Sequence, residues 1–144
     1  MKKIKVYVAS SFEIKDKAAE VISLCHTAGL QVTHDWTKES WEGLTGGDLK
    51  RAQTKNAYED FVGARDCDWI ILLNSPKGCG CWTELGIAMG AGKGAIVVQA
   101  YEPGFMHNIF THLPGIFVVP SAMKAIKRIL IEERVIHEED DEQD

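Results

Sequence analysis

Glu84 stands where an open α/β sheet would place a ligand site. It lies in a glycine-containing segment, residues 78–86, between a strand-like apolar run at 69–73 and a helix-like run at 82–90. Ligands of open α/β sheets bind beyond the carboxyl ends of the strands. In the first turn of a helix we expect Glu84 to be ionised, because the partial positive charge of a helix N-terminus favours a carboxylate, which suits a nucleophile. A helix-favouring acid without a chemical role would fit the same position.

Asp60 is the candidate for a second carboxylate. Cleavage of a glycosidic bond needs one carboxylate at the anomeric carbon and a second group that manages the proton of the leaving group. Asp60 lies in a predicted helix over 48–65, on one face with Asn56 and Ala64. That helix leads into the strand before Glu84, so its C-terminal half can lean over the same crevice. An ordinary solvated helix face is the alternative interpretation.

Other chemistries receive little support. Cys25 and Cys67 stand in apolar surroundings typical of buried thiols, and Cys79 and Cys81 have Cys-x-Cys spacing rather than the Cys-x-x-Cys of zinc sites. The five histidines form no close pair. We therefore expect no metal.

The nucleotide and hydrolase motifs are also missing. Segment 78–86 does not continue as a dinucleotide fingerprint, and the chain has no Walker A sequence. A triad of Ser10, His34 and Asp35 would lack the Gly-x-Ser-x-Gly elbow. No cofactor is expected.

Composition indicates one globular domain over 1–136, since the 144 residues are 45% hydrophobic and 26% charged. The net charge of -5 comes from residues 137–144, an acidic tail that we expect to be disordered. Without a basic stripe, polymeric nucleic acid is not an expected partner. No apolar run approaches the roughly 18 residues of a membrane span, and the N-terminal residues lead directly into a strand. We expect a cytoplasmic protein without a membrane partner.

Strand-like and helix-like segments alternate along the chain. Strands are predicted at 4–9, 30–36, 67–74, 95–99 and 116–119, and helices at 14–28, 48–65, 82–90 and 121–134. This alternation predicts an α/β domain with a doubly wound five-stranded parallel sheet in the flavodoxin-like order 2-1-3-4-5. Strands 1 and 3 are then neighbours, so Ser10, Ser11 and Phe12 should face residues 75–84.

Aromatic residues near the strand ends are candidates for stacking on a base: Phe12, Trp36 and Trp82. Core packing is an equally good explanation for Trp36. The polar loop at 37–47 is a candidate lid, in which Trp41 could close over a base.

Several of these segments together resemble the nucleoside 2-deoxyribosyltransferase family over most of residues 4–130. They are Tyr-Val-Ala-Ser at 7–10, Asp60 eight residues before Asp68, Glu-Leu-Gly-Ile-Ala at 84–88, and Gly-Lys at 92–93. The resemblance implies a flavodoxin-like fold and an enzyme of nucleotide metabolism and salvage. The family includes transferases that exchange the base of a 2'-deoxynucleoside and hydrolases of deoxynucleoside 5'-monophosphates.

The resemblance assigns roles to the two acids. Glu84 is the implied nucleophile at C1' of the deoxyribose, and Asp60 assists departure of the base. The covalent deoxyribosyl-enzyme would then pass the sugar to a second base or to water. The expected partners are a small-molecule nucleoside or nucleotide and a free nucleobase. A 5'-monophosphate N-glycosidase is one alternative, and a nucleotide-binding module without turnover is another.

The chain departs from the family at two positions near the nucleophile. Gly78 stands where transferases carry an Asp that contacts the sugar and monophosphate hydrolases carry a Ser, and Trp82 replaces a glycine. Asn108 resembles a residue that reaches the 5'-hydroxyl from a neighbouring subunit, which implies a homo-oligomer with shared sites. The expected substrate-binding residues are Ser10, Ser11, Phe12, Trp36, Gly78, Gly80, Trp82 and Asn108.

Overall fold

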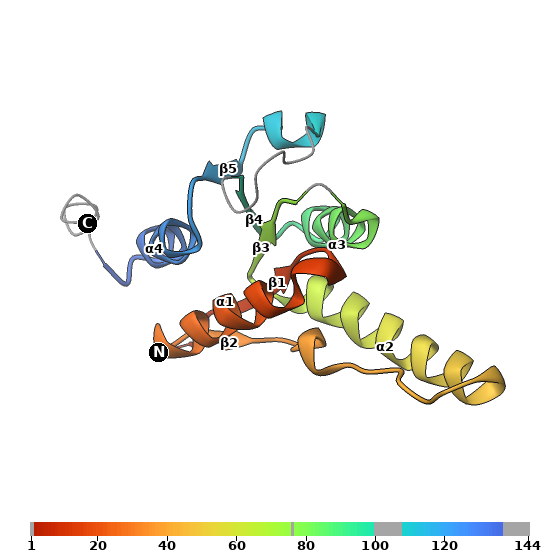
Figure 1. The fold of residues 1–144 in the computed structure, drawn as a ribbon. Coiled ribbons are helices and arrows are strands. Elements are labelled where there is room, and N and C mark those ends of the chain that lie inside the picture. Colours follow the sequence, from red (N-terminus) through yellow and green to blue (C-terminus); the bar gives the residue numbers. More distant parts are fainter. Residues whose placement is uncertain (1, 76, 100–107, 137–144) are drawn as a thin grey trace.

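The computed structural model describes residues 2–75, 77–99 and 108–136. Five parallel strands form one sheet in the order β2-β1-β3-β4-β5 (Figure 1). The strands are β1 (Lys5–Ala9), β2 (Gln31–Val32), β3 (Trp69–Leu73), β4 (Gly94–Val98) and β5 (Ile116–Val119). The predicted flavodoxin-like architecture and strand order are confirmed.

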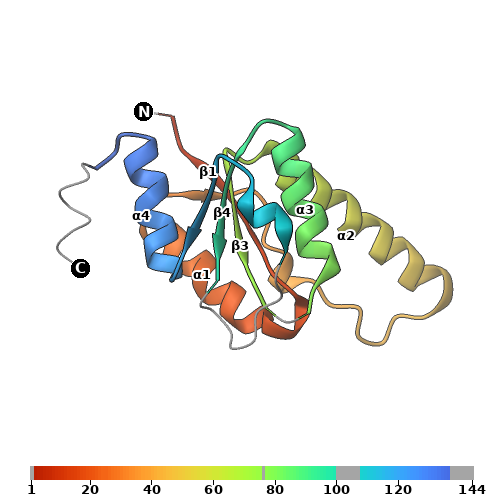
Figure 2. The same ribbon diagram turned by 90° about the horizontal axis from the view of Figure 1, so that it is seen from above.

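Helices cover both faces of the sheet, with α1 and α4 on one face and α2 and α3 on the other (Figures 1 and 2). Their bounds are α1 (Lys15–Thr27), α2 (Gly46–Asp66), α3 (Cys79–Gly90) and α4 (Ala122–Glu132). Three short 3₁₀ helices are η1 (Phe12–Ile14), η2 (Trp36–Lys38) and η3 (Ile109–His112). Because both faces are covered, β3 is buried at every residue and has a continuous apolar sequence. Cys25 and Cys67 are buried free thiols, as predicted.

Several element boundaries differ from the prediction by one to four residues, and three of these differences bear on the site. The second strand ends at Val32, because the chain then turns into η2 and buries Trp36, whose indole Nε1 donates to the backbone oxygen of Val8 at 2.7 Å. Helix α2 begins at Gly46, so Asp48 lies in the first turn beside Arg51 and does not cap the helix. Helix α3 begins at Cys79, which moves Glu84 into the second turn.

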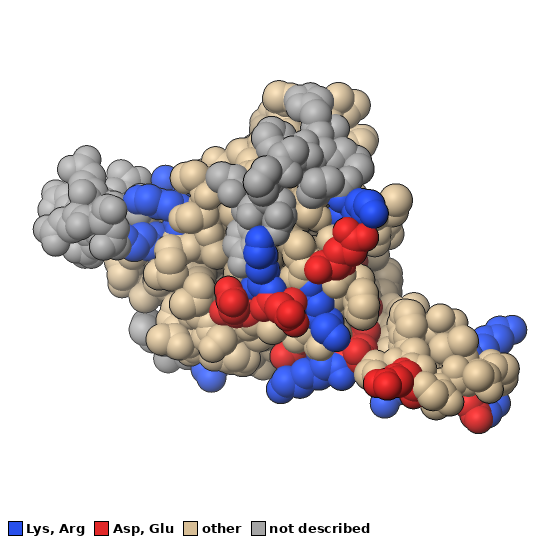
Figure 3. Space-filling model, viewed as in Figure 1, with Lys and Arg blue, Asp and Glu red and all other residues tan. Residues whose placement is uncertain are grey.

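Figure 3 shows acidic and basic side chains mixed on the visible face, without a continuous basic surface among the described residues. Of the helices within the described ranges, none has the length and apolar character needed to cross a bilayer. The acidic segment 137–144 lies outside the described residues.

Gly94 is expected to be required by the packing of β3 against β4. It is the cross-strand partner of Trp69, and a Cβ at Gly94 would meet the indole ring at 2.4–2.6 Å. The ring cannot move away easily, because Trp69 Nε1 donates to Glu133 Oε1 at 2.9 Å. Gly94→Ala should therefore lower the free energy of unfolding by about 1–3 kcal/mol, measured by urea denaturation.

The matched control is Gly86→Ala, within α3, where a Cβ would meet no atom within 4 Å. This change should leave stability unchanged or raise it by up to about 1 kcal/mol, because alanine favours a helix over glycine. Equal effects of the two substitutions would contradict the steric explanation.

Candidate active site

The loops that follow β1 and β3 are in direct contact, as the strand order predicted. Ser75 Oγ lies 3.0 Å from Ser11 Oγ, and both residues are buried, as is Ser10. Gly78 has a φ of +129°, and a Cβ there would lie 2.9 Å from Ser11 Cβ. The close approach of the two loops therefore requires glycine at position 78, and leaves no room for an Asp or Ser side chain in this arrangement.

Glu84 projects from the second turn of α3 toward Tyr7 of β1. Burial raises the pKa of Glu84 to about 8, and the nearby Asp60 and Glu39 add to the rise, while the Tyr7 hydroxyl opposes it. The expectation that the helix N-terminus keeps Glu84 ionised is wrong. The carboxyl group lies beyond the first turn, where the helix dipole acts most strongly, and it is removed from water.

Tyr7 is a site residue that the sequence interpretation missed. Its ring is fully buried, and burial together with the Glu84 carboxylate raises the pKa of Tyr7 far above its usual range, so it remains a neutral hydroxyl. Tyr7 Oη faces the Glu84 carboxylate without forming a well-aligned hydrogen bond. Among the described residues, Tyr7 Oη and Glu84 Oε2 are buried atoms with no hydrogen-bond partner.

Asp60 lies in the same group of acids, on the C-terminal half of α2. Burial, a hydrogen bond shared with Glu39 and the charge of Glu39 raise the pKa of Asp60 to about 7, while His34 opposes the rise. The charge of Asp60 in turn raises the pKa of Glu84, so the two predicted catalytic acids influence each other. The structure thus brings Glu84 and Asp60 together.

Gly63 allows α2 to approach this group closely. A Cβ at Gly63 would lie 3.0 Å from the ring of Tyr7 and 3.1 Å from Cβ of His34. Its backbone oxygen also accepts a hydrogen bond from Thr33 Oγ1 at 2.9 Å. A glycine one helical turn after Asp60 is therefore the local feature that holds the acid beside β1.

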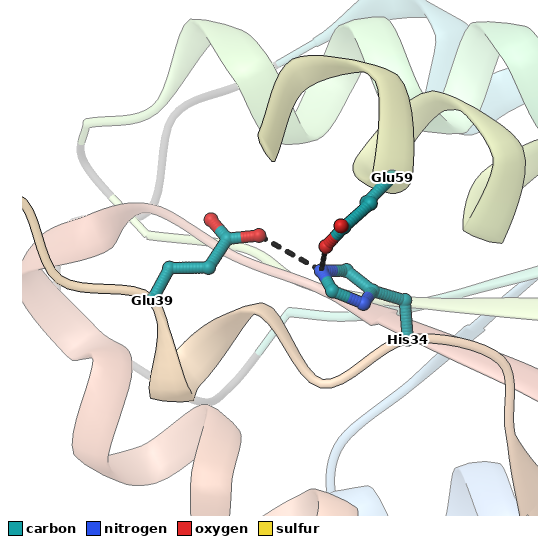
Figure 4. Close-up of side chains that lie close together, drawn as sticks. All are labelled: His34, Glu39 and Glu59. Carbon is teal, nitrogen blue, oxygen red and sulfur yellow. Dashed lines mark hydrogen bonds and ion pairs between the residues drawn. The ribbon is translucent and has the colours of Figure 1, made fainter. Parts of the chain in front are cut away.

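Figure 4 shows His34 between Glu39 and Glu59, and these two acids were not predicted site residues. The three side chains offer one nitrogen and two carboxylate oxygens within 4.8 Å of one another, a donor set of the kind that divalent transition metals use. His34 Nε2 is already paired with Glu39 Oε1 at 2.8 Å, so a cation would have to displace this hydrogen bond. The spacing of His34 and Glu39 in the sequence matches no motif that would have identified them as site residues. Tyr7 could have been identified, because it is the one polar side chain in the otherwise apolar run at 6–9.

Phe12 lies beside one acid of this group, Glu39. It is 68% exposed and lines a cavity of about 240 Å³ with Trp41 and Glu39; the other lining residues are Lys15, Ser40 and Glu42. The cavity thus joins two aromatic side chains to one of the clustered acids. Trp36 is only 8% exposed and belongs to the core, so its predicted stacking face is not accessible here.

Trp82 and Asn108 line a different cavity, of about 450 Å³, between α3 and η3. Neither Glu84 nor Asp60 lines it. Asn108 Oδ1 accepts a hydrogen bond from the backbone nitrogen of Phe110 at 2.9 Å. Within one chain, Trp82 and Asn108 therefore do not lie with the acids. At Gly80, another predicted substrate-binding residue, an added Cβ would meet no atom within 4 Å, so packing does not require glycine there. The role of Asn108 in a neighbouring subunit stays a prediction.

Comparison with known proteins supports the fold. No protein-family model and no curated protein matches the chain. Among solved structures, the chain is similar to the CMP N-glycosidase BcmB from Clostridium botulinum, with a TM-score of 0.57 and 15% identity. The similarity covers 87% of this chain and 97% of that chain. At this identity, the likeness establishes a shared architecture.

The protonation of Glu84 should be visible in the stability of the protein. A carboxyl group whose pKa rises on folding binds its proton more tightly in the native state, so stability falls as pH rises from its unfolded value of 4.5 to about 8. Glu84→Gln removes this loss. The variant should gain on the order of a few kcal/mol relative to the parent between pH 4 and pH 9, measured by urea denaturation across this range.

Glu20→Gln, on the exposed side of α1, is the control and should follow the parent curve. If the Glu84→Gln curve also runs parallel to the parent, Glu84 is not protonated near neutral pH.

Proposed function

We propose that the protein cleaves the N-glycosidic bond of 2'-deoxynucleosides or their nucleotides and transfers the sugar to another base or to water. The observation that carries this proposal is the pairing of two partly buried acids, Glu84 and Asp60, beside the neutral hydroxyl of Tyr7. This class of reaction requires two carboxyl groups, one as the nucleophile and one as the general acid and base. The similar architecture of a CMP N-glycosidase is consistent with it.

Glu84 is the proposed nucleophile. Its carboxylate oxygen bonds to C1' while the bond from C1' to the base nitrogen breaks, and the electron pair of that bond stays with the base. Asp60 gives its proton to the departing base. In this step the Tyr7 hydroxyl, which faces Glu84 but has no hydrogen-bond partner among the described residues, would donate a hydrogen bond to the Glu84 carboxylate.

The second step restores both acids. Water or a second base attacks C1', the bond from C1' to the Glu84 oxygen breaks, and Asp60 takes the proton from the attacking group. Glu84 then leaves as a carboxylate, and Asp60 is again a carboxylic acid. No further proton donor is needed for turnover.

The reaction needs Glu84 ionised and Asp60 protonated at the same time. With pKa values of about 8 for Glu84 and about 7 for Asp60, this combination is most populated between the two values. Because the two groups interact, the values describe the pair. The rate should therefore follow a bell-shaped dependence on pH with its maximum between about 7 and 8.

Hydrolysis of 5'-monophosphates is a second candidate. Three buried serines, Ser10, Ser11 and Ser75, lie at the contact between the loops after β1 and β3, and hydroxyl groups can bind phosphate oxygens. In this arrangement the sugar would enter the crevice with its 5' end toward the serines, while Phe12 and Trp41 would contact the base.

A substrate panel separates these activities. The protein is incubated with deoxyinosine and adenine, with dCMP, and with CMP, and free and exchanged bases are followed by chromatography. Base exchange supports transfer, and release only from monophosphates supports the second candidate. Ligand binding without release of any base would instead indicate a nucleotide-binding module and contradict the proposed function.

Glu84→Ala should reduce base release by at least about a thousandfold, because the covalent step loses its nucleophile. The rate is measured on the best substrate of the panel, and circular dichroism checks that the fold is retained. Glu20→Ala is the matched control and should keep the parent rate. A Glu84→Ala variant with parental activity would remove Glu84 from the mechanism.

Asp60→Asn should slow the release of an ordinary base by about 10²–10⁴-fold, the usual contribution of a general acid. A 7-methylguanine substrate carries a positive charge on its base, which departs without a proton. The same variant should cleave this substrate at nearly the parent rate. Equal losses on both substrates would assign Asp60 a role other than that of the acid.

A further inference from the structure

His34 is surrounded by carboxylates from two segments of the chain. Its Nε2 lies 2.8 Å from Glu39 Oε1, 3.3 Å from Asp60 Oδ1 and 3.6 Å from Glu59 Oε2. Glu39 follows η2, whereas Glu59 and Asp60 belong to α2. One imidazole nitrogen therefore links the loop before α2 to the proposed general acid.

Glu39 and Asp60 are close enough to share a hydrogen bond. Two ionised carboxylates have only acceptor atoms, so this contact requires a proton on one of the two groups. Glu39 is the more buried of the two side chains, at 15% exposed against 28% for Asp60, but it also has the closer donor. His34 Nε2 lies 2.8 Å from Glu39 Oε1 and 3.3 Å from Asp60 Oδ1, so the imidazole stabilises a negative charge on Glu39 more than on Asp60. This arrangement favours the proton on Asp60 and the negative charge on Glu39.

We propose that Glu39 and His34 are positioning residues for the acid: Glu39 accepts a hydrogen bond from the protonated Asp60 carboxyl, and His34 holds Glu39 in place. His34 Nε2 donates to Glu39 Oε1, which fixes the carboxylate that Asp60 contacts. The inference rests on the function proposed above, because it explains how the acid of that reaction keeps its proton.

Glu59 does not have the same role. It lies farther from His34 Nε2 than the other two acids, its side chain is 36% exposed, and it pairs with Lys55 Nζ at 3.7 Å. Water and Lys55 screen its charge. Glu59 therefore serves as the internal control for the effect of a nearby negative charge.

Five groups face Asp60, and their effects differ. Burial apart, Glu39 is the main cause of the raised pKa of Asp60, Glu59 adds to it, and His34 lowers it. Glu84 from α3 and Tyr7 from β1 are also near enough for the charge of Asp60 to raise the pKa of both groups. A change at Glu39 should thus have the largest effect and a predictable sign.

The test measures the protonation of Asp60 directly. Carboxyl groups of aspartate are labelled with ¹³C, the Asp60 signal is identified as the one missing in Asp60→Asn, and its titration is followed by NMR in the presence of a chelator. In Glu39→Gln the pKa of Asp60 should fall by about one unit or more, because a charge and a hydrogen-bond acceptor for the protonated form are weakened together. In Glu59→Gln the fall should be smaller.

A substitution of His34 distinguishes the proposed role of Glu39 from general damage to the site. Glutamine in His34→Gln can still donate to Glu39 but carries no positive charge, so the pKa of Asp60 should stay the same or rise. An unchanged pKa in Glu39→Gln, or an equal fall in His34→Gln and Glu39→Gln, would overturn the inference. Glu39→Ala is a second variant at that position, and the pKa of Asp60 should fall in it as well.

Kinetics separate this inference from the proposed function. In Glu39→Gln the rate on ordinary bases near pH 7.5 should fall about tenfold or more relative to the same variant's rate on a 7-methylguanine substrate, when this ratio is compared with that of the parent. If the titrations shift as expected while the parent releases no base, the proposed function fails and the pairing of Glu39 with Asp60 stands. If the parent is active and the Asp60 titration does not respond to Glu39→Gln, the inference alone fails.

Discussion

Burial of the Glu84 carboxyl beside Tyr7 is the constraint on which the site depends. A helix N-terminus stabilises a nearby carboxylate by about 0.3–1 kcal/mol, which corresponds to less than one pKa unit. Burial moves the pKa of Glu84 from 4.5 to about 8 and clearly exceeds that effect. The carboxylate is therefore poorly solvated, and its stabilisation must come from whatever occupies the site. Tyr7 is the only neutral hydroxyl donor that faces it among the groups acting on its pKa.

Two glycines make this burial possible. Gly63 lets α2 pass within contact distance of Tyr7 and His34, and Gly78 lets the loop after β3 approach Ser11. A side chain at Gly63 would press against the ring of Tyr7 and so increase the distance between α2, which carries Asp60, and β1. The acids are thus brought together by the packing of backbone segments, and their mutual repulsion is relieved by protonation, which is why their pKa values rise.

The architecture could be predicted because its signals are local and repeated. The apolar runs that became β3 and β4 are continuous, as expected for strands covered on both sides, and their alternation with helical segments indicates a parallel sheet, for which the observed order is a common one. The second strand was predicted too long, since residues 33–36 have strand-like character but leave the sheet when Trp36 enters the core. A tertiary contact, the hydrogen bond to the backbone of Val8, decides that boundary.

The site was predictable only in part, for a related reason. Glu84 and Asp60 stand in segments whose placement follows from the strand order, so their proximity could be expected. Glu39 and His34 join them through the docking of α2 on the preceding loop, which has no periodic signal. Trp82 is close to Glu84 in sequence, yet it lines the cavity beside η3, because neighbouring positions of a helix point to different sides.

The order of the two pKa values has a consequence for catalysis in the proposed reaction. Because the pKa of Glu84 lies above that of Asp60, the form with Glu84 ionised and Asp60 protonated is not the favoured state of the pair near neutral pH. The reactive form is thus a minority before substrate binds. As the bond to the base breaks, however, positive charge develops at C1' beside Glu84. A desolvated carboxylate gains more from that charge than a solvated one, because the surrounding dielectric is low. The raised pKa of Glu84 therefore costs ground-state population but increases the interaction that exists only in the transition state, which is the interaction that accelerates a reaction.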